Sequence, residues 1–144
     1  TPFTPAISLI ISLRESLRLI QEEGLANVFE RHRRLARATR AAMSALGLEL
    51  FAPNASSDAV TAVKVPPGID GKKLVKELRD EWGITLAGGQ SELTGKIFRI
   101  AHMGWTTEFD ILMGISALEM WLFRAGCKLE LGAGVRAAEK EFLK

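Results

Sequence analysis

An arginine in the middle of an apolar strand and a pair of adjacent glycines before it are the features most suited to binding a ligand. Arg99 has apolar neighbours on both sides in the segment 96–103, which Gly95 and Gly104 bracket. A guanidinium stays protonated, so an arginine inside a strand needs an anionic partner. Either a carboxylate of this chain supplies that partner, or an anionic ligand does.

The adjacent glycines lie in the segment Ala-Gly-Gly-Gln at 87–90. Gly88 and Gly89 let backbone approach a ligand closely. The segment is too short for a dinucleotide-binding fingerprint, and no helix follows it. The sequence offers no nucleophile with its base, no metal-binding spacing and no paired carboxylates. Together with Arg99, the glycines indicate a site that binds a carboxylate, not one that transforms it.

Four other features have structural explanations that the sequence favours. The basic run at 31–40 lies on a helix whose other face is apolar, and it holds no aromatic residue for stacking on bases, which favours a solvated helix face. His32 falls on the apolar stripe of that helix, and His102 falls on the strand face opposite Arg99; we interpret both as structural. Cys127 has no basic cluster to activate it as a nucleophile.

Composition and charge exclude several classes of function. The chain has 144 residues, a net charge of +2 and one cysteine. The small net charge does not favour nucleic acid, and no apolar run approaches the ~20 residues of a membrane span. A single cysteine fits a reducing compartment, so we predict a cytoplasmic protein. The sequence opens in a Pro-rich stretch without an initiator Met, and we expect it to be a piece of something longer.

Hydrophobic periodicity predicts a mixed α and β domain. Helices are expected over about 7–21, 25–46, 71–82, 108–125 and 131–142, and extended segments over 48–51, 60–65, 84–87 and 96–103. Asp70 is placed to cap the third helix, and Thr107 with Asp110 to cap the fourth. This order predicts two long helices followed by a small, mostly antiparallel sheet with helices over one face. The opening helix pair has surplus apolar surface and should brace another domain or subunit.

Several motifs together resemble the C-terminal part of a class V aminotransferase. They are "TPAISLIISLRESL" at the start, then "GLANVFERHRRLARATRAAMSALGLELF", "GITLAGGQ", "GKIFRIAHMG" and, at the end, "ELGAGVRAAEKEFL". The resemblance covers nearly the whole chain in the right order. It is to pyridoxal-phosphate enzymes of the alanine–glyoxylate and serine–pyruvate group, and to a branch often labelled the small subunit of a soluble hydrogenase.

The resemblance implies roles for the candidate residues. Residues 1–144 would be the small domain, with 1–46 as interdomain and dimer helices and 47–144 as the sheet-and-helix core. Arg99 would hold the α-carboxylate of an amino-acid substrate, with Gly88 and Gly89 nearby. Thr4 would reach the cofactor phosphate of the other subunit of a homodimer. Two alternatives stay open: Arg99 could pair with an internal Glu, and Thr4 could cap its helix.

The resemblance also implies what this chain does not contain. The Schiff-base lysine, the aspartate that pairs with the pyridine nitrogen and most of the phosphate cup belong to a large domain upstream. None of the lysines at 64, 72, 73, 76 and 96 matches the family's lysine motif. We therefore expect the chain to be inactive alone, and its Arg99 guanidinium to be partly exposed at one edge of the sheet, without a close Asp or Glu.

In the whole enzyme, an amino acid such as alanine or serine would give its amino group to a 2-oxo acid such as glyoxylate or pyruvate. A cysteine desulfurase of the same superfamily is less favoured, because Cys127 is not in a mobile active-site loop. The alternative from a different class is a non-catalytic interaction or scaffolding module that acts through the N-terminal helix pair.

Overall fold

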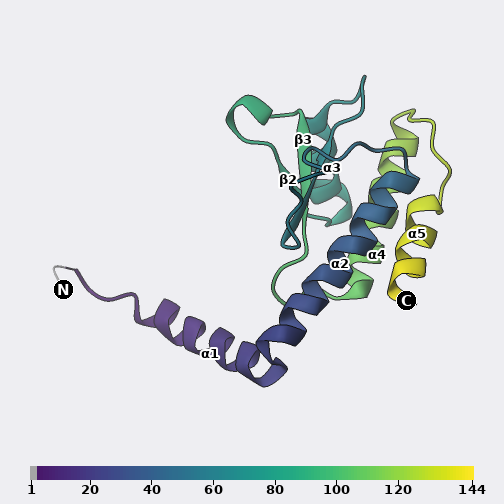
Figure 1. Ribbon diagram of the computed structural model, residues 1–144. Coiled ribbons are helices and arrows are strands. Elements are labelled where there is room, and N and C mark those ends of the chain that lie inside the picture. The colour runs from purple at the N-terminus through teal and green to yellow at the C-terminus, as the bar shows by residue number, and fades with distance from the viewer. Residues whose placement is uncertain (1–2) are drawn as a thin grey trace. The chain divides into compact units, whose positions relative to one another are not determined.

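The computed structural model describes residues 3–144, so the first two residues of the predicted helical segment 1–46 lie outside the described residues. Its contacts divide the chain into two compact units, residues 1–31 and 32–144. The elements in chain order are α1 (Ile7–Glu23), α2 (Leu25–Ala45), β1 (Val60–Lys64), α3 (Gly71–Trp82), β2 (Ala87–Gly88), the 3-10 helix η1 (Ser91–Leu93), β3 (Ile97–Ala101), α4 (Glu108–Arg124) and α5 (Ala133–Phe142) (Figure 1).

The first unit consists of α1 and the beginning of α2. None of the described residues of α1 is buried, and its large apolar side chains are exposed. Gly24, with a φ of 84°, separates the two helices and donates its N–H to the carbonyl of Ile20. The guanidinium of Arg31 pairs with Glu23 across this break, at 2.7 Å. The apolar surface expected on the opening helix is therefore present and uncovered in this chain.

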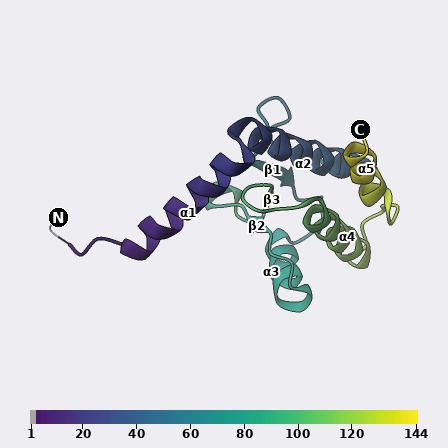
Figure 2. The same ribbon diagram turned by 90° about the horizontal axis from the view of Figure 1, so that it is seen from below.

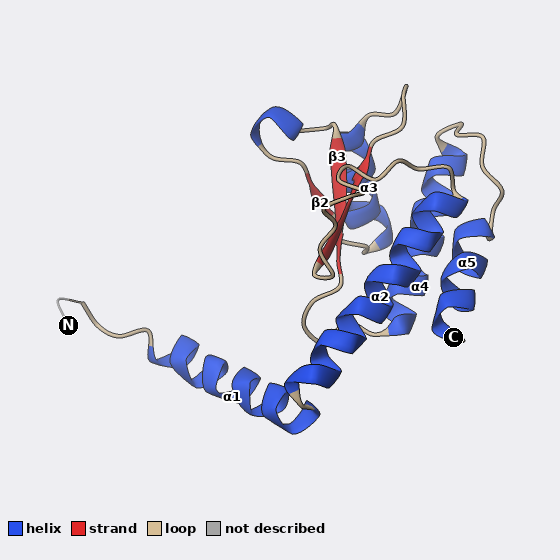
Figure 3. Cartoon of the chain, in the orientation of Figure 1, coloured by secondary structure: helices blue, strands red, loops and turns tan. Residues whose placement is uncertain are grey.

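The second unit contains a three-stranded antiparallel sheet in the order β1-β3-β2, so β3 is the central strand (Figure 3). The predicted strand at 84–87 is wrong in its position. The N–H of Ile84 donates to the carbonyl of Leu78 and completes the end of α3, so pairing with β3 begins only at Ala87. The expected extended segment 48–51 forms a single bridge, from Leu50 to Val63.

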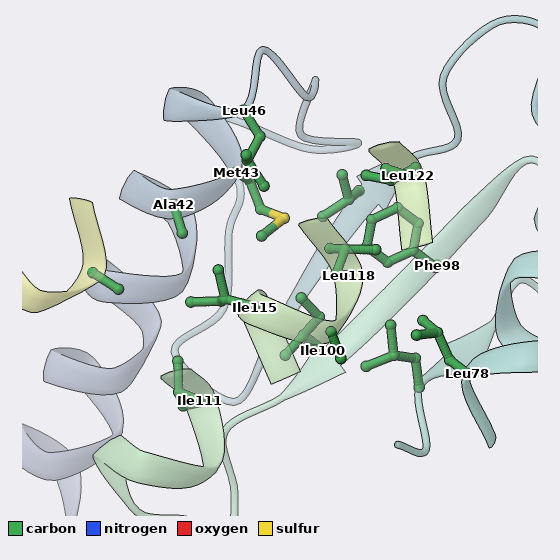
Figure 4. Close-up of a cluster of buried hydrophobic side chains, with 14 of the residues drawn as sticks. Ala42, Met43, Leu46, Leu78, Phe98, Ile100, Ile111, Ile115, Leu118 and Leu122 are labelled. Carbon is green, nitrogen blue, oxygen red and sulfur yellow. The ribbon is translucent and has the colours of Figure 1, made fainter. Parts of the chain in front are cut away.

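Helices cover one face of this sheet, as the sequence predicts. Phe98 and Ile100 of β3 point into a core built from α2, α3, α4 and α5, and Figure 4 shows them beside Leu118 and Leu122. Val63 pairs with Phe98 and lies in the same core. In β1, buried and partly exposed residues alternate, which is the period of a sheet with one covered face. We call the other side of the sheet its open face.

Both predicted helix starts are confirmed by their caps. The Asp70 side chain accepts hydrogen bonds from the N–H groups of Lys72 and Lys73, at 2.9 and 3.1 Å. Thr107 and Asp110 form a reciprocal capping box, in which each side chain accepts from the backbone N–H of the other residue. Two of the core helices thus begin at residues that short-range chemistry specifies.

A buried carboxylate joins α4 to α5, which lies beside it in Figure 2. Glu119 is only 2% exposed, and its two oxygens accept hydrogen bonds from the backbone N–H groups of Gly132, Gly134 and Val135. These donors lie at the N-terminus of α5, where the helix dipole and the free N–H groups favour an anion. A Cβ at Gly134 would lie 2.7 Å from a Glu119 oxygen, so glycine permits this approach.

Replacement of this carboxylate should loosen α5. We expect Glu119→Ala to lower the free energy of unfolding by about 2–4 kcal/mol, because it leaves the buried N–H groups at the start of α5 without an acceptor. Urea unfolding followed by circular dichroism measures the change. Glu130→Ala is the control, since Glu130 forms only an exposed ion pair with Arg136. A loss for Glu119→Ala no larger than that of the control would contradict this account.

Candidate functional site

Arg99 lies at the middle of the central strand, on the open face of the sheet. The residues paired with it are Ala62 on β1 and Ala87 on β2. Directly paired residues share a face, so only two methyl groups flank the arginine side chain across the sheet. Arg99 is half-buried as a result. The expectation that it lies at one edge of the sheet is wrong, because its exposure comes from small neighbours on a central strand.

The guanidinium of Arg99 has one hydrogen-bonding partner among residues 3–144. Its Nε donates to the backbone carbonyl of Gly88, at 3.1 Å. No Asp or Glu of the described chain forms an ion pair with it. The two terminal nitrogens therefore remain as donors, in the planar arrangement that matches the two oxygens of a carboxylate.

The two adjacent glycines have different reasons to be glycine. A Cβ at Gly89 would lie 2.0 Å from the carbonyl oxygen of Leu93, because the η1 turn passes directly over this position. The N–H of Gly89 also donates to the carbonyl of Ile97, at 3.0 Å. A Cβ at Gly88 would meet only a methyl group of Val75, at 3.9 Å. Gly89 thus has a packing role, whereas Gly88 contributes its carbonyl to Arg99.

Thr4 belongs to the first unit and is exposed just before α1. The N-cap of α1 is Ala6, and among residues 3–144 no side chain forms a capping hydrogen bond with this helix. The alternative in which the Thr4 hydroxyl caps its helix is therefore wrong. The Thr4 hydroxyl remains a candidate hydrogen-bond donor. It belongs to a different compact unit from Arg99.

The basic run on α2 is largely neutralised by the chain itself. Arg33 and Arg40 both pair with Asp58, at 3.7 and 3.0 Å, and Arg34 pairs with Glu108 and lies over the ring of Phe142. Arg40 is half-buried, so it does not belong to the solvated face on which the sequence placed it. The run attaches α2 to neighbouring elements, which argues against a free surface for phosphates.

His102 is fully buried on the covered face, away from Arg99. Its Nδ1 lies 3.2 Å from the carbonyl oxygen of Asp58. The Nε2 atoms of His102 and His32 and the hydroxyl of Thr61 are buried without a hydrogen-bonding partner in the described part of the chain. Burial lowers the pKa of His102, and the positive charge of Arg40 lowers it further, against the opposing effect of the Asp58 carbonyl.

Other chemistry finds little support within residues 3–144. No group of three or more His, Cys, Asp or Glu side chains there is placed to hold a metal ion. Cys127 is half-buried, and burial raises the pKa of its thiol, which disfavours the reactive thiolate. None of the described helices is both long and apolar enough to cross a membrane.

The chain matches a known family over most of its length. Residues 3–105 match the family described as "Aminotransferase class-V". The chain is 45% identical to the "Soluble hydrogenase, small subunit" of a Synechococcus species, over 97% of this chain and 37% of that protein. It is 42% identical to a serine–glyoxylate aminotransferase of Arabidopsis thaliana, over 95% of this chain and 35% of that protein. The chain belongs to the class-V aminotransferase family.

Solved structures of such enzymes contain the same fold. The ureidoglycine–glyoxylate aminotransferase of Bacillus subtilis superposes with a TM-score of 0.93 at 36% identity, over 99% of this chain and 37% of that one. The pyridoxamine–pyruvate aminotransferase of Mesorhizobium loti gives the same values. The chain thus spans little more than a third of the length of these proteins, and the predicted fold class is confirmed.

Sequence reasoning missed the groups that surround Arg99. Ala62, Ala87 and the Gly88 carbonyl lie on the two strands that pair with β3. The register of these strands cannot be predicted from the local sequence pattern. Ala62 is visible in the sequence only as an alternate residue of the strand at 60–65. Ala62 matters to the site only because the register of β1 with β3 pairs it with Arg99, 37 positions away.

The two glycines should respond differently to an added methyl group. We expect Gly89→Ala to lower the free energy of unfolding by about 1–3 kcal/mol, the usual effect of overpacking, because its Cβ would collide with the Leu93 carbonyl. Gly88→Ala is the matched control and should change it by less than about 0.5 kcal/mol. Urea unfolding of both variants measures this. Equal effects would show that the close approach of η1 does not require a glycine.

Protonation of His102 should destabilise the fold. Its pKa is lowered in the folded state, so its neutral form stabilises the fold fully above the unfolded pKa of about 6.5. That contribution is lost as the pH falls toward the lowered pKa, with a slope of at most about 1.4 kcal/mol per pH unit.

His102→Gln removes this titration, so its free energy of unfolding should change less between pH 7 and pH 5 than that of the unchanged chain. His32→Gln is the matched control, since these are the only two histidines in the sequence. Urea unfolding at several pH values measures both. An unaltered pH dependence in His102→Gln would contradict the assignment.

Proposed function

We propose that this chain is the C-terminal small domain of a pyridoxal-phosphate-dependent aminotransferase, and that Arg99 binds the α-carboxylate of the amino-acid substrate. The observation that carries the proposal is the unpaired guanidinium on the open face of the sheet, flanked by Ala62 and Ala87. A charged group held there without an internal carboxylate is available to an anion from outside the unit. Membership of the class-V aminotransferase family supports an amino acid as that anion.

The geometry of Arg99 restricts how the carboxylate binds. Its Nε is occupied by the Gly88 carbonyl, so a carboxylate would bind end-on, to the two terminal nitrogens. Two parallel hydrogen bonds fix the plane of the carboxylate as well as its position. The amino group of the substrate is then presented in one orientation, which is the contribution that a positioning residue makes to catalysis.

The cofactor would supply an electron sink for the carbanion that forms when the substrate loses its α-proton. The groups of this chain that fit the cofactor are few. The exposed hydroxyl of Thr4 is not used for helix capping, and we propose that it donates to the cofactor phosphate bound by the other subunit. A hydroxyl before a helix N-terminus suits this role.

No lysine of the chain is proposed to carry the cofactor. Lys64, Lys73 and Lys76 form surface ion pairs with Glu49, Glu77 and Asp80. We place the Schiff-base lysine, the aspartate at the pyridine nitrogen and the phosphate cup in a large domain of the whole protein, and we propose that this chain is inactive without them. The greater length of the relatives supports this division.

The names of the relatives suggest the substrates. Relatives include serine–glyoxylate and L-aspartate–glyoxylate aminotransferases and a pyridoxamine–pyruvate transaminase. Their acceptors are small 2-oxo acids, whereas their amino donors differ. We propose transfer from an amino acid such as alanine or serine to glyoxylate or pyruvate.

The exposed apolar face of α1 fits the same proposal. Residues 1–46 would pack against the large domain and the other subunit of a cytoplasmic homodimer, and residues 47–144 would form the small-domain core. A scaffolding module that uses α1 to bind an unrelated partner is the second candidate, and the exposure of Ile7, Ile10 and Leu13 favours it to the same degree. Only the aminotransferase proposal accounts for the unpaired Arg99.

Conservative replacement of Arg99 tests the proposed function. In the whole protein, Arg99→Lys should weaken binding of an amino-acid substrate and of a dicarboxylate inhibitor by roughly a hundredfold, or about 2–3 kcal/mol, since a lysine cannot form the paired hydrogen bonds. Affinity for pyridoxal phosphate should stay nearly unchanged. Both are measured by titration while the cofactor absorbance is followed.

Arg136→Lys is the control, because Arg136 lies on α5 and forms an exposed ion pair with Glu130, which precedes that helix. It should alter neither affinity. Unchanged carboxylate binding in Arg99→Lys would remove Arg99 from the substrate site. A parallel loss of cofactor affinity would show that the replacement disturbs the site as a whole.

A further inference from the structure

The solvent face of α4 carries a line of large apolar side chains. Phe109, Met113, Met120 and Phe123 are 79%, 56%, 52% and 53% exposed, and Ser116 lies between the two methionines. The spacing along this line is four, three, four and three residues. That alternation keeps side chains in one row on a helix and is the repeat by which two helices pack along their length. We call these five residues the α4 stripe.

The α4 stripe lies opposite the side of the helix that faces the core. The core side is formed by Ile111, Ile115, Leu118 and Leu122, all of which are buried. At 100° per residue, these four centre on the direction opposite the stripe. Single exposed apolar residues are ordinary, but a contiguous row over four helical turns marks an interaction surface.

We propose that the α4 stripe binds a second copy of this chain, with the two α4 helices antiparallel about a two-fold axis at Ser116. The order of residues along the stripe is Phe, Met, Ser, Met, Phe, which reads the same in both directions. An interface between identical copies about a two-fold axis uses the same patch on both and must be self-complementary. In the antiparallel arrangement Phe109 meets Phe123 of the other copy, and Met113 meets Met120.

The charges beside the stripe also favour an antiparallel arrangement of the two α4 helices. Acidic Glu108 and Asp110 lie at the start of α4, and Arg124 lies at its end. Antiparallel packing brings the acidic end of one helix to the basic end of the other, whereas parallel packing would bring like charges together. These side chains already have partners within the chain, so they select the direction of packing more than they add affinity.

The position of the stripe separates it from the candidate site. Arg99 lies on the open face of the sheet, and α4 lies on the covered face with the stripe directed away from the core. The stripe and Arg99 therefore lie on different sides of the sheet. The test of the stripe does not involve Arg99, so its outcome is separate from that of the proposed function.

Site-specific disulfide formation tests the proposal. In this chain with Cys127→Ser as background, Ser116→Cys should form a covalent dimer on mild oxidation, because the two-fold axis brings position 116 against itself. Phe109→Cys should not, since in an antiparallel pair the two copies of position 109 are about 21 Å apart, far beyond the ~7 Å that a disulfide spans. Lys140→Cys, exposed on α5, measures the yield from random collision.

A charge within the stripe provides the second variant. Met120→Glu, added to the Ser116→Cys chain, should abolish the covalent dimer while leaving the circular dichroism spectrum unchanged, since Met120 is exposed. A Ser116→Cys yield no higher than that of Lys140→Cys would overturn the proposal. So would efficient dimer formation by Phe109→Cys, which would indicate parallel helices, or a dimer that Met120→Glu does not affect.

Discussion

The burial of Phe98 and Ile100 beneath the helices is the interaction on which the candidate site depends. A strand directs alternate residues to opposite faces, so placing these two side chains in the core directs Arg99 to the open face. A slip of one residue would exchange the faces and bury a guanidinium among apolar side chains without a counter-ion. The hydrophobic core therefore fixes the direction of the one side chain proposed to bind substrate.

Pairing within the sheet then determines how accessible that side chain is. Alanines lie next to Arg99 on both neighbouring strands, and larger residues at these positions would cover the guanidinium. The position of β2 depends in turn on Gly89, which lets the η1 turn pass close to the strand. From β2 the Gly88 carbonyl holds Nε. The accessibility of Arg99 thus depends on the register of the strands and on small neighbouring residues more than on any acidic or polar partner.

Local patterns predicted much of this fold and only part of the site. The core helices and the caps at Asp70 and Thr107 could be predicted because they depend on neighbours within a few residues. The strand at 84–87 was misplaced because the end of α3 takes the N–H of Ile84. Arg99 stood out as an unpaired charge, but its central strand and its alanine neighbours depend on long-range pairing. The same holds for Glu119, whose hydrogen-bond donors are backbone N–H groups at the start of the next helix.

Arg99 and His102 show how one short segment holds two ionisable groups in opposite states. They are three positions apart in the sequence, an odd number, so they lie on opposite faces of the strand. On the covered face, burial and the nearby Arg40 favour the neutral imidazole, and the ring is accommodated without a full set of hydrogen bonds. On the open face, the Arg99 guanidinium is partly exposed and forms no ion pair with any other residue of 3–144. The sheet therefore has a neutral imidazole on one side and a cationic guanidinium on the other, and an anion would be attracted to the side of Arg99.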